Sequence, residues 1–240
     1  MIVILSPAKT FSKNITGYET KPIFFDDAVF LNKKLRKLSS KVISSAMKIS
    51  EELAKKVKDD YESFNLSPRA AIYAYDGYAF KGFDVPTLNQ KALNYSKDHL
   101  MILSGLYGIV RPFDGITPYR LEIKDKTVLN LYQFWKKKIA SYINNHYLDE
   151  LIINLSSKEY AKVLDLKVQM INIEFTKRIH QKPKKSSMEI KHMRGVMARY
   201  LIMNPIATSD ELKKIKIEGY HYDDVLSTKD AYIFITEDEL

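Results

Sequence analysis

The sequence lacks cysteine and any hydrophobic run close to the ~20 residues that a membrane-spanning helix needs. The absence of cysteine excludes disulfides, thiolate nucleophiles and cysteine-ligated zinc or iron–sulfur sites. The first residues enter an apolar strand pattern directly, without a basic segment and a long apolar segment, so we expect no signal peptide. These absences favour a cytoplasmic protein with no membrane partner.

Several catalytic and metal-binding motifs are missing as well. No Gly-x-Ser-x-Gly sequence is present, which argues against a serine hydrolase, and no glycine-rich phosphate loop occurs. The five histidines are scattered, without the spacing of a metal-binding motif. We therefore expect no metal site and no cofactor, and direct iron binding has little support.

Glycine and proline are scarce, with eight of each, yet three glycines and two prolines fall within residues 105–118. They interrupt the stretch 103–122, which follows an apolar strand pattern at residues 99–103. A loop anchored by a strand, with its backbone fixed by Gly and Pro, is typical of functional sites. Its polar side chains are Tyr107, Arg111, Asp114, Tyr119, Arg120 and Glu122. The alternative is a structural connection in which neighbouring Arg and acidic residues pair only to hold the loop in shape.

The net charge of +9 is unevenly distributed along the chain. Residues 32–60 contain nine Lys or Arg and four acidic residues, and residues 177–199 contain eight Lys or Arg against Glu189 alone. A basic excess concentrated in segments is the pattern of a surface that binds a polyanion. The alternative is a lysine-rich composition that places Lys on every solvated face.

Two short apolar runs, at residues 2–5 and 151–155, each lead into a turn that carries Ser and Lys. Continuous apolar runs of this length are typical of buried strands. Ligands commonly bind at the carboxyl ends of strands in α/β folds. Lys9 and Lys158, which follow these runs, are therefore candidate binding residues.

Residues 30–58 have a helical pattern, with a break at Ser39 and Ser40 that can end one helix and cap the next. We interpret residues 31–58 as a helix-hairpin-helix-like element with Lys41 and Lys48 nearby. Such elements bind phosphates through backbone amides of the turn and a following Lys. The usual Gly-rich hairpin is missing, so a plain packed helix pair is the alternative.

The rest of the chain predicts further helices and strands in alternation. We expect strands at residues 70–75, 168–175 and 232–236, helices at 88–97, 127–147, 188–203 and 210–215, and an exposed basic loop or hairpin tip at 177–187. Residues 76–83 place aromatic rings and Lys81 around two glycines and could stack bases, although core packing is the alternative. The fold class is α/β (mixed α+β): a single domain over residues 1–240 with a mixed sheet and flanking helices.

Six motifs occur in a fixed order along the sequence. They are residues 5–10, 103–114, 118–122, 131–135, 153–160 and 194–200. Together they resemble the YaaA family, the peroxide stress resistance proteins formerly known as a domain of unknown function. The resemblance runs from the first residues nearly to the last.

The resemblance implies a cytoplasmic bacterial protein that limits damage from hydrogen peroxide and lowers free intracellular iron. It also implies DNA binding, a mixed α/β fold, a positively charged cleft and a helix-hairpin-helix element corresponding to residues 35–54. Two departures concern the DNA contacts. Residues 39–41 lack the Pro usual in the hairpin, and Lys-His-Met at residues 191–193 stands where the family favours Lys-x-Ala.

Two hypotheses follow for function. In the first, a basic cleft binds duplex or branched DNA through phosphates, protecting DNA in peroxide stress with little sequence preference. Its candidate contacts are Lys9, Lys41, Lys48, Lys81, Arg111, Arg120, Lys158, Arg194 and Arg199. In the second, the protein is an enzyme with a nucleotide or nucleic-acid substrate, and its site contains Lys9, Arg111, Asp114 and Arg120. Lys9 would act as nucleophile or electrostatic stabiliser, and Asp114 or Glu122 as general acid or base.

Overall fold

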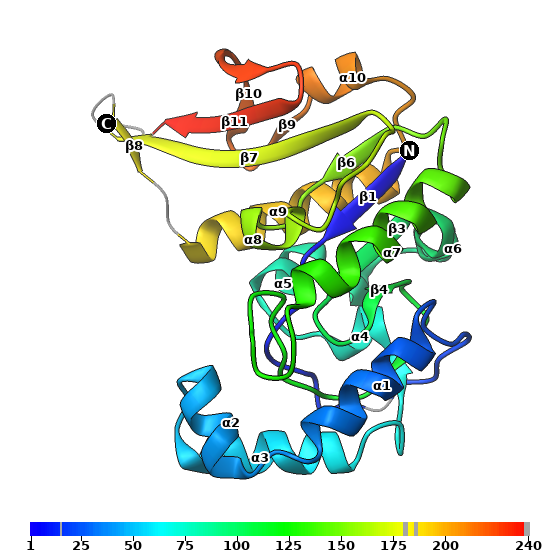
Figure 1. Ribbon diagram of the computed structural model, residues 1–240. Coiled ribbons are helices and arrows are strands. Elements are labelled where there is room, and N and C mark those ends of the chain that lie inside the picture. The colour runs from blue at the N-terminus through cyan, green and yellow to red at the C-terminus, as the bar shows by residue number, and fades with distance from the viewer. Residues whose placement is uncertain (15, 180–181, 185–186, 238–240) are drawn as a thin grey trace.

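The computed structural model describes residues 1–14, 16–179, 182–184 and 187–237, and Figure 1 shows its elements. The strands are β1 (Ile2–Leu5), β2 (Arg69–Ala70), β3 (Leu100–Ser104), β4 (Gly108–Val110), β5 (Gly115–Ile116), β6 (Ile152–Asn154), β7 (Met170–Ile179), β8 (Lys182–Lys184), β9 (Lys216–Ile217), β10 (Tyr220–Thr228) and β11 (Ala231–Glu237). The helices are α1 (Phe25–Leu35), α2 (Ser40–Met47), α3 (Glu51–Glu62), α4 (Ala71–Ala74), α5 (Tyr78–Phe83), the 3₁₀ turn η1 (Val85–Thr87), α6 (Gln90–His99), α7 (Leu131–His146), α8 (Lys158–Ala161), α9 (Ser187–Met203) and α10 (Ser209–Lys213).

A mixed sheet of nine strands, counted over the described residues, organises the fold in the order β4-β3-β1-β6-β7-β11-β10-β9, with β8 paired to β7. The five strands β3, β1, β6, β7 and β11 are parallel, whereas β4 and β10 run antiparallel to their neighbours. The mixed α/β fold with flanking helices expected from the sequence is therefore confirmed.

The central strand β1 is buried on both faces, as its continuous apolar sequence predicts. Ile2 and Ile4 pack in the cluster that contains Trp135 of α7, so the tryptophan lies in the core. Val3 and Leu5 point to the other face, in the cluster with Met197 and the rest of α9. Helices thus cover both faces of the sheet.

The basic segment at residues 31–58 forms parts of three helices at the end of the molecule opposite β10 and β11 (Figure 1). The predicted break at Ser39 is confirmed, because its hydroxyl accepts a hydrogen bond from the Val42 N–H at 3.3 Å and caps α2. A second break was not predicted. Lys48 adopts a left-handed conformation (φ 54°) that ends α2, and Ser50 caps α3 by accepting a 3.2 Å hydrogen bond from Leu53 N–H.

The predicted strand at residues 70–75 is wrong beyond its first residue. Only Arg69 and Ala70 are in a strand, and Ala71–Ala74 form the helical turn α4. The segment contains three alanines, the residue with the highest helix propensity, and only one β-branched residue. Residues 78–83, for which no secondary structure was predicted, form helix α5.

The stretch 103–122 is not an exposed loop. Ser104 ends β3, β4 pairs antiparallel with β3, and most side chains of this stretch are buried. Trp135 fixes the turn between β3 and β4 because its indole N–H donates to the Gly105 carbonyl oxygen at 2.9 Å. Much of this stretch is therefore a structural connection, as in the alternative given above, and only residues 119–122 border a cavity.

Most of the remaining predicted helices and strands are confirmed. α6, α7, α9, β6, β7 and β11 occupy the predicted segments. The predicted helix at residues 210–215 is present as α10, and Thr208 and Glu211 form a capping box at its start. Part of residues 177–187 extends β7 and pairs it with β8, while residues 180, 181, 185 and 186 lie outside the described residues. The short β9 and the polar, largely exposed β10 were not predicted. No helix of the described part of the chain has the length and apolar character to cross a membrane.

Candidate anion-binding cavity

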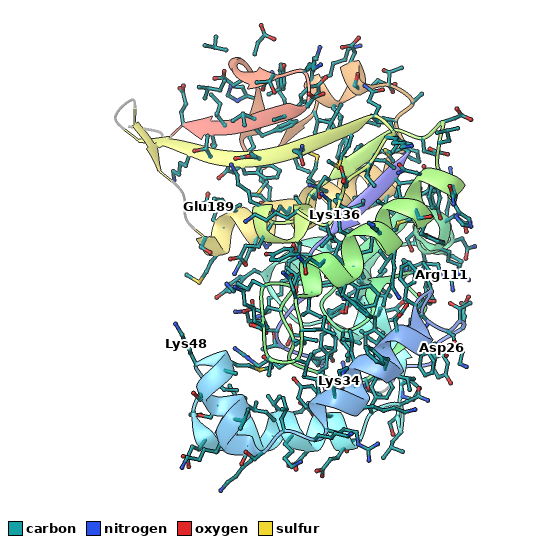
Figure 2. All side chains as sticks on the ribbon, in the orientation of Figure 1. Asp26, Lys34, Lys48, Arg111, Lys136 and Glu189 are labelled. Atoms are coloured by element: carbon teal, nitrogen blue, oxygen red, sulfur yellow. The ribbon has the colours of Figure 1, made fainter. Side chains whose placement is uncertain are left out.

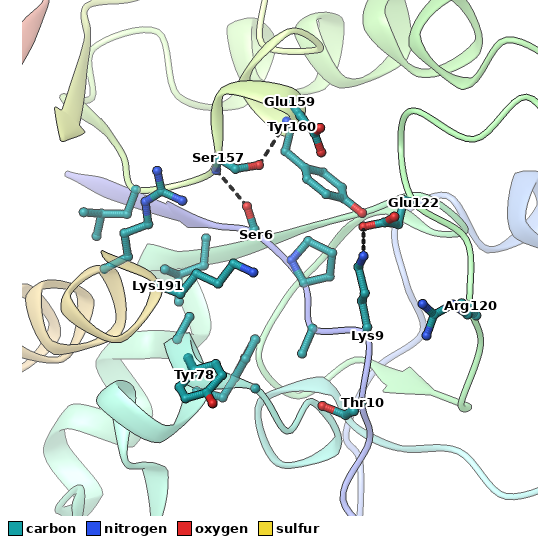
Figure 3. A pocket seen from close by; sticks show the side chains of 18 of the residues that line it. Ser6, Lys9, Thr10, Tyr78, Arg120, Glu122, Ser157, Glu159, Tyr160 and Lys191 are labelled. Carbon is teal, nitrogen blue, oxygen red and sulfur yellow. Dashed lines mark hydrogen bonds and ion pairs between the residues drawn. The ribbon is translucent and has the colours of Figure 1, made fainter. Parts of the chain in front are cut away.

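A cavity of about 360 Å³ lies where several carboxyl-terminal strand ends and loops meet (Figure 3). The segment after β1 forms one wall and the turn after β6 forms another. The N-terminus of α5, one side of α9 and the segment after β5 complete the lining. The polar and charged lining residues are Ser6, Lys9, Thr10, Tyr78, Tyr119, Arg120, Glu122, Lys124, Ser157, Glu159, Tyr160, Lys191 and Arg194.

Sheet topology explains why a cavity forms here. The next parallel strand after β1, β3, lies on one side of it, and the following one, β6, lies on the other. The connections after these strands diverge and leave a crevice at their carboxyl ends, the common ligand site of open α/β sheets. Ser6 spans this crevice, since its hydroxyl accepts a 2.8 Å hydrogen bond from Ser157 N–H. The strand-end site predicted from residues 2–10 and 151–158 is therefore where the cavity lies.

Close packing of α5 against α9 sets the width of the cavity. A Cβ on Gly195 would overlap the carbonyl oxygen of Ala79, and a Cβ on Gly82 would overlap that of His192. The two helices approach this closely only because both positions are glycine. The contact brings Tyr78 at the start of α5 near the first turns of α9.

Two ion pairs occupy one side of the cavity. Lys9 Nζ lies 2.8 Å from Glu122 Oε1, and Lys124 Nζ lies 3.0 Å from Glu159 Oε1. The Glu122 turn is held by Asp125, whose carboxylate accepts a hydrogen bond from Glu122 N–H at 2.7 Å. Burial raises the pKa of Asp125, with attraction to nearby lysines opposing the shift. These lysines are neutralised within the protein.

Three other cations of the cavity have no such partner. Among the described residues, the side chains of Arg120, Lys191 and Arg194 form no ion pair and no hydrogen bond. Figure 3 shows Lys191 reaching in from α9, with Arg120 and the Lys9–Glu122 pair on the opposite side. Since Glu122 and Glu159 are already paired with Lys9 and Lys124, these three cations leave the cavity with an excess of positive charge that attracts an anionic ligand.

Arg194 is the most constrained of the three. Its Nε–H is buried and lacks an acceptor among the described residues, a situation that costs on the order of 1–3 kcal/mol. Burial lowers the pKa of its guanidinium, which attraction to Glu174 partly offsets. An arginine left in this state marks a position where a ligand oxygen would relieve the deficit.

A buried hydroxyl network forms the floor next to this charged lining. Tyr119 OH lies 2.8 Å from Tyr75 OH and 2.7 Å from Ser104 Oγ, and Ser104 in turn accepts from backbone N–H groups. Burial raises the pKa of both tyrosines, so they stay protonated. The network fixes the segment that leads to Arg120, which Tyr61 OH of α3 also holds by donating to the Arg120 carbonyl oxygen.

Arg111 and Asp114, both candidate residues, lie outside the cavity. Asp114 is fully buried and accepts hydrogen bonds from Arg111 N–H at 2.8 Å, Arg111 Nη2 at 2.9 Å and Thr20 Oγ1 at 2.6 Å. Arg111 also donates to the Lys21 carbonyl oxygen at 3.0 Å. Their geometry is that of a structural pair that ties residues 20–21 to the β4–β5 connection.

The other predicted binding residues are dispersed. Lys158 pairs with Glu174 at 2.7 Å beside the cavity, and Arg199 donates to the carbonyl oxygens of Phe83 and Asp84. Lys81 and Arg199 border a separate hollow. Lys41 and Lys48 are exposed, and Figure 2 shows Lys48 and Arg111 on well-separated parts of the molecule. Of the nine predicted nucleic-acid contacts, the cavity brings together only Lys9, Arg120 and Arg194, with the candidate acid Glu122.

Lys191 and Tyr78 border the cavity without having been predicted as site residues. Lys191 could have been found from its spacing, because it lies three residues before Arg194 and so on the same face of a helix. Tyr78 lies in residues 76–83, whose aromatic rings were expected either to stack bases or to pack in the core. The helix that they form gave no sequence signal, and its approach to α9 depends on two isolated glycines.

Comparison with known proteins now identifies the family. Residues 1–226 match the family model described as peroxide stress protein YaaA. The chain belongs to the YaaA family. The family name supports a role in peroxide stress. A UPF0246 protein of Crocosphaera subtropica is 36% identical over 249 residues, covering 98% of this chain and 100% of that protein. A UPF0246 protein of Francisella tularensis subsp. holarctica is 33% identical over 252 residues, covering 98% of this chain and 99% of that protein.

Proposed function

We propose that this YaaA-family protein is a cytoplasmic DNA-binding protein of the peroxide stress response. It protects DNA and limits free intracellular iron, and it binds DNA mainly through backbone phosphates. The observation that carries the proposal is the convergence of Arg120, Lys191 and Arg194, three cations without anionic partners, on one cavity. Unpaired cations gain more from a phosphate than cations already in ion pairs, because no internal pair is broken.

The helices α2 and α3 offer a second region of contact. They pack against each other through the turn at Lys48, as in a helix hairpin. The first turn of α3, however, carries Glu51 and Glu52, which repel a phosphate approaching its backbone amides. We therefore assign the phosphate contacts of this element to the exposed side chains of Lys41 and Lys48.

Titration of a fluorescently labelled duplex with the full chain at low salt tests the proposal by anisotropy. Saturable binding that unrelated duplexes compete away equally well is expected, because phosphate contacts carry little sequence information. The Lys136→Gln variant is a suitable control, since Lys136 pairs with Asp165 outside the cavity. Absence of binding to both duplex and branched DNA at low salt would contradict the proposal.

The effect on iron is proposed to be indirect and is tested in cells. Deleting the gene is expected to raise chelatable iron after peroxide treatment, and expressing the chain should reverse the rise. The Arg194→Gln variant should fail to reverse it if iron limitation depends on the same cavity. Unchanged chelatable iron in the deletion strain would remove iron limitation from the proposal and leave DNA binding in place.

A second candidate function is catalysis on a nucleotide or nucleic acid. The Lys9–Glu122 pair at the cavity favours it, because an amine and a carboxylate 2.8 Å apart can share a proton during a reaction. In this version Glu122 is the general acid or base, and Lys9 is the nucleophile or stabilises developing negative charge. Product analysis after incubation with labelled DNA and nucleotides tests it, with Lys9→Met as the inactive control.

A further inference from the structure

We propose that the cavity binds a single nucleoside monophosphate unit, either a free nucleotide or one nucleotide swung out of a DNA strand. The DNA form rests on the function proposed above, whereas the free-nucleotide form does not. The inference follows from the size of the cavity, the placement of its charges and the composition of its walls.

The cavity has a size that suits one nucleotide. Its volume of about 360 Å³ is at the lower end of small-molecule sites, which span roughly 300–1,000 Å³. The lining comes from five separate segments that surround the space, as Figure 3 shows. A paired duplex can only pass across the mouth of such a space, whereas one nucleotide unit can enter it.

The phosphate subsite is formed by the cations that lack partners. Lys191 and Arg194 are three residues apart on α9 and face the cavity together, and Arg120 comes from the opposite wall. Arginine presents a planar fork that matches phosphate oxygens, and lysine supplies a point charge. Three positive charges match a phosphate monoester, which carries about −1.5 to −2 at pH 7.

The nucleoside subsite is formed by apolar walls and one aromatic ring. Tyr78 is 46% exposed at the edge of the cavity, and although Lys81 Nζ lies over its ring at 5.7 Å, the exposed part of the ring can stack on a base. The apolar lining residues are Leu5, Pro7, Ala8, Ala79, Phe80, Leu121 and Leu155. A base is flat and largely apolar on its faces, so it suits these walls better than a sugar phosphate or an amino acid does.

The two acidic residues of the lining restrict the ligand to a monophosphate. Glu122 and Glu159 accept hydrogen bonds, which suits the amino group of a base or a sugar hydroxyl. Because both carboxylates are already paired with Lys9 and Lys124, only Arg120, Lys191 and Arg194 remain to balance phosphate charge. We therefore expect a monophosphate to bind more tightly than a triphosphate.

Isothermal titration calorimetry of the full chain with dAMP, dATP and inorganic phosphate tests whether the cavity binds a free nucleotide. One dAMP per chain is expected, with tighter binding than dATP or phosphate. Lys191→Gln and Arg194→Gln should each weaken dAMP binding about tenfold or more, because each removes a charge-assisted contact. Lys136→Gln on α7 removes the same charge as Lys191→Gln outside the cavity and should leave dAMP binding unchanged.

The DNA form is tested with two duplexes that differ by one unpaired nucleotide. The wild type is expected to bind the bulged duplex more tightly than the paired duplex. This preference should be lost in Arg194→Gln and retained in Lys136→Gln, which would show that the cavity binds an unpaired nucleotide of the strand. Either dAMP binding or this bulge preference supports the inference. If neither occurs, the inference is overturned, and binding to the paired duplex still decides the proposed function separately.

Discussion

Lys9 and Glu122 form a 2.8 Å ion pair that joins the segment after β1 to the segment after β5 at the cavity. The side chain of Lys9 is 51% exposed and that of Glu122 is 23% exposed, so the pair is screened by solvent. Pairs of this kind contribute at most about 1 kcal/mol to stability. The main consequence of the pair is electrostatic, because Glu122 offsets a positive charge next to the three unpaired cations.

Replacing Glu122 by glutamine is expected to tighten DNA binding several-fold. The change removes a negative charge from the cavity and releases Lys9 to contact a phosphate. Lys9→Met should weaken binding by a similar factor, and both variants should keep the thermal midpoint of the wild type within a few degrees. Anisotropy titrations at one salt concentration measure the affinities. The ligand is a fully paired duplex, which passes across the mouth of the cavity, so weaker binding by Glu122→Gln would contradict this electrostatic role of the carboxylate.

Arg194 is expected to lower the stability of the fold while it contributes to DNA binding. Arg194→Met removes a buried donor without an acceptor, so the free energy of unfolding should stay the same or rise by about 1 kcal/mol. Affinity for DNA should fall in the same variant. Urea denaturation and anisotropy measure the two quantities.

Arg199 on the same helix is the matched control for Arg194. Its guanidinium donates hydrogen bonds to the carbonyl oxygens of Phe83 at 3.2 Å and Asp84 at 2.9 Å. Arg199→Met should therefore lower the free energy of unfolding by about 1–3 kcal/mol. An equal loss of stability in Arg194→Met would show that Arg194 has a structural role and would contradict its assignment to the ligand.

Gly195→Ala is expected to destabilise the fold by several kcal/mol or to prevent it, because the new methyl group overlaps backbone atoms of α5. Gly17 is the matched control, since a Cβ there meets no atom within 4 Å. Gly17→Ala should leave the thermal midpoint nearly unchanged. A Gly195→Ala variant as stable as the wild type would mean that α5 and α9 do not pack this closely.

Stability should also fall at high pH because of buried tyrosines. Burial raises the pKa of Tyr107 from 10.0 to about 12, with hydrogen bonds from Thr117 opposing the shift. The folded state therefore favours the neutral phenol, and this contribution is complete below pH 10 and lost as the pH rises towards 12. Tyr107→Phe should reduce the pH dependence of the unfolding free energy between pH 9 and 12. An unchanged dependence would exclude Tyr107 as a cause.

The sequence placed candidate binding residues at the ends of two predicted strands, and the cavity lies at those strand ends. Continuous apolar runs at residues 2–5 and 151–155 are distinctive because both faces of the central strands are buried. Lys9 follows the first of these runs, whereas Arg194 lies in the basic segment at residues 177–199. The alternation of helix and strand patterns predicted a mixed α/β fold, the family resemblance implied the same fold, and the structure confirms it.

The parts that were not predicted depend on tertiary contacts. Arg111 and Asp114 resemble site residues in sequence, yet the complete burial of Asp114 next to Thr20 makes their pair structural. The end of α2 at Lys48 was missed because a lysine in the left-handed conformation has no sequence signal comparable to that of glycine. Which cations remain outside ion pairs depends on which acidic residues lie near them. These neighbours come from segments far apart in the sequence, so the pairs form only in the folded structure.

The salt dependence of DNA affinity tests the central claim most directly, because it counts the phosphate charges that the protein neutralises. The variant combining Arg120→Gln, Lys191→Gln and Arg194→Gln is compared with the wild type on one duplex. If the three unpaired cations contact phosphates, the slope of log affinity against log salt should become shallower in the variant by about 0.9 for each phosphate contact that is lost. Equal slopes for the two proteins would contradict the account.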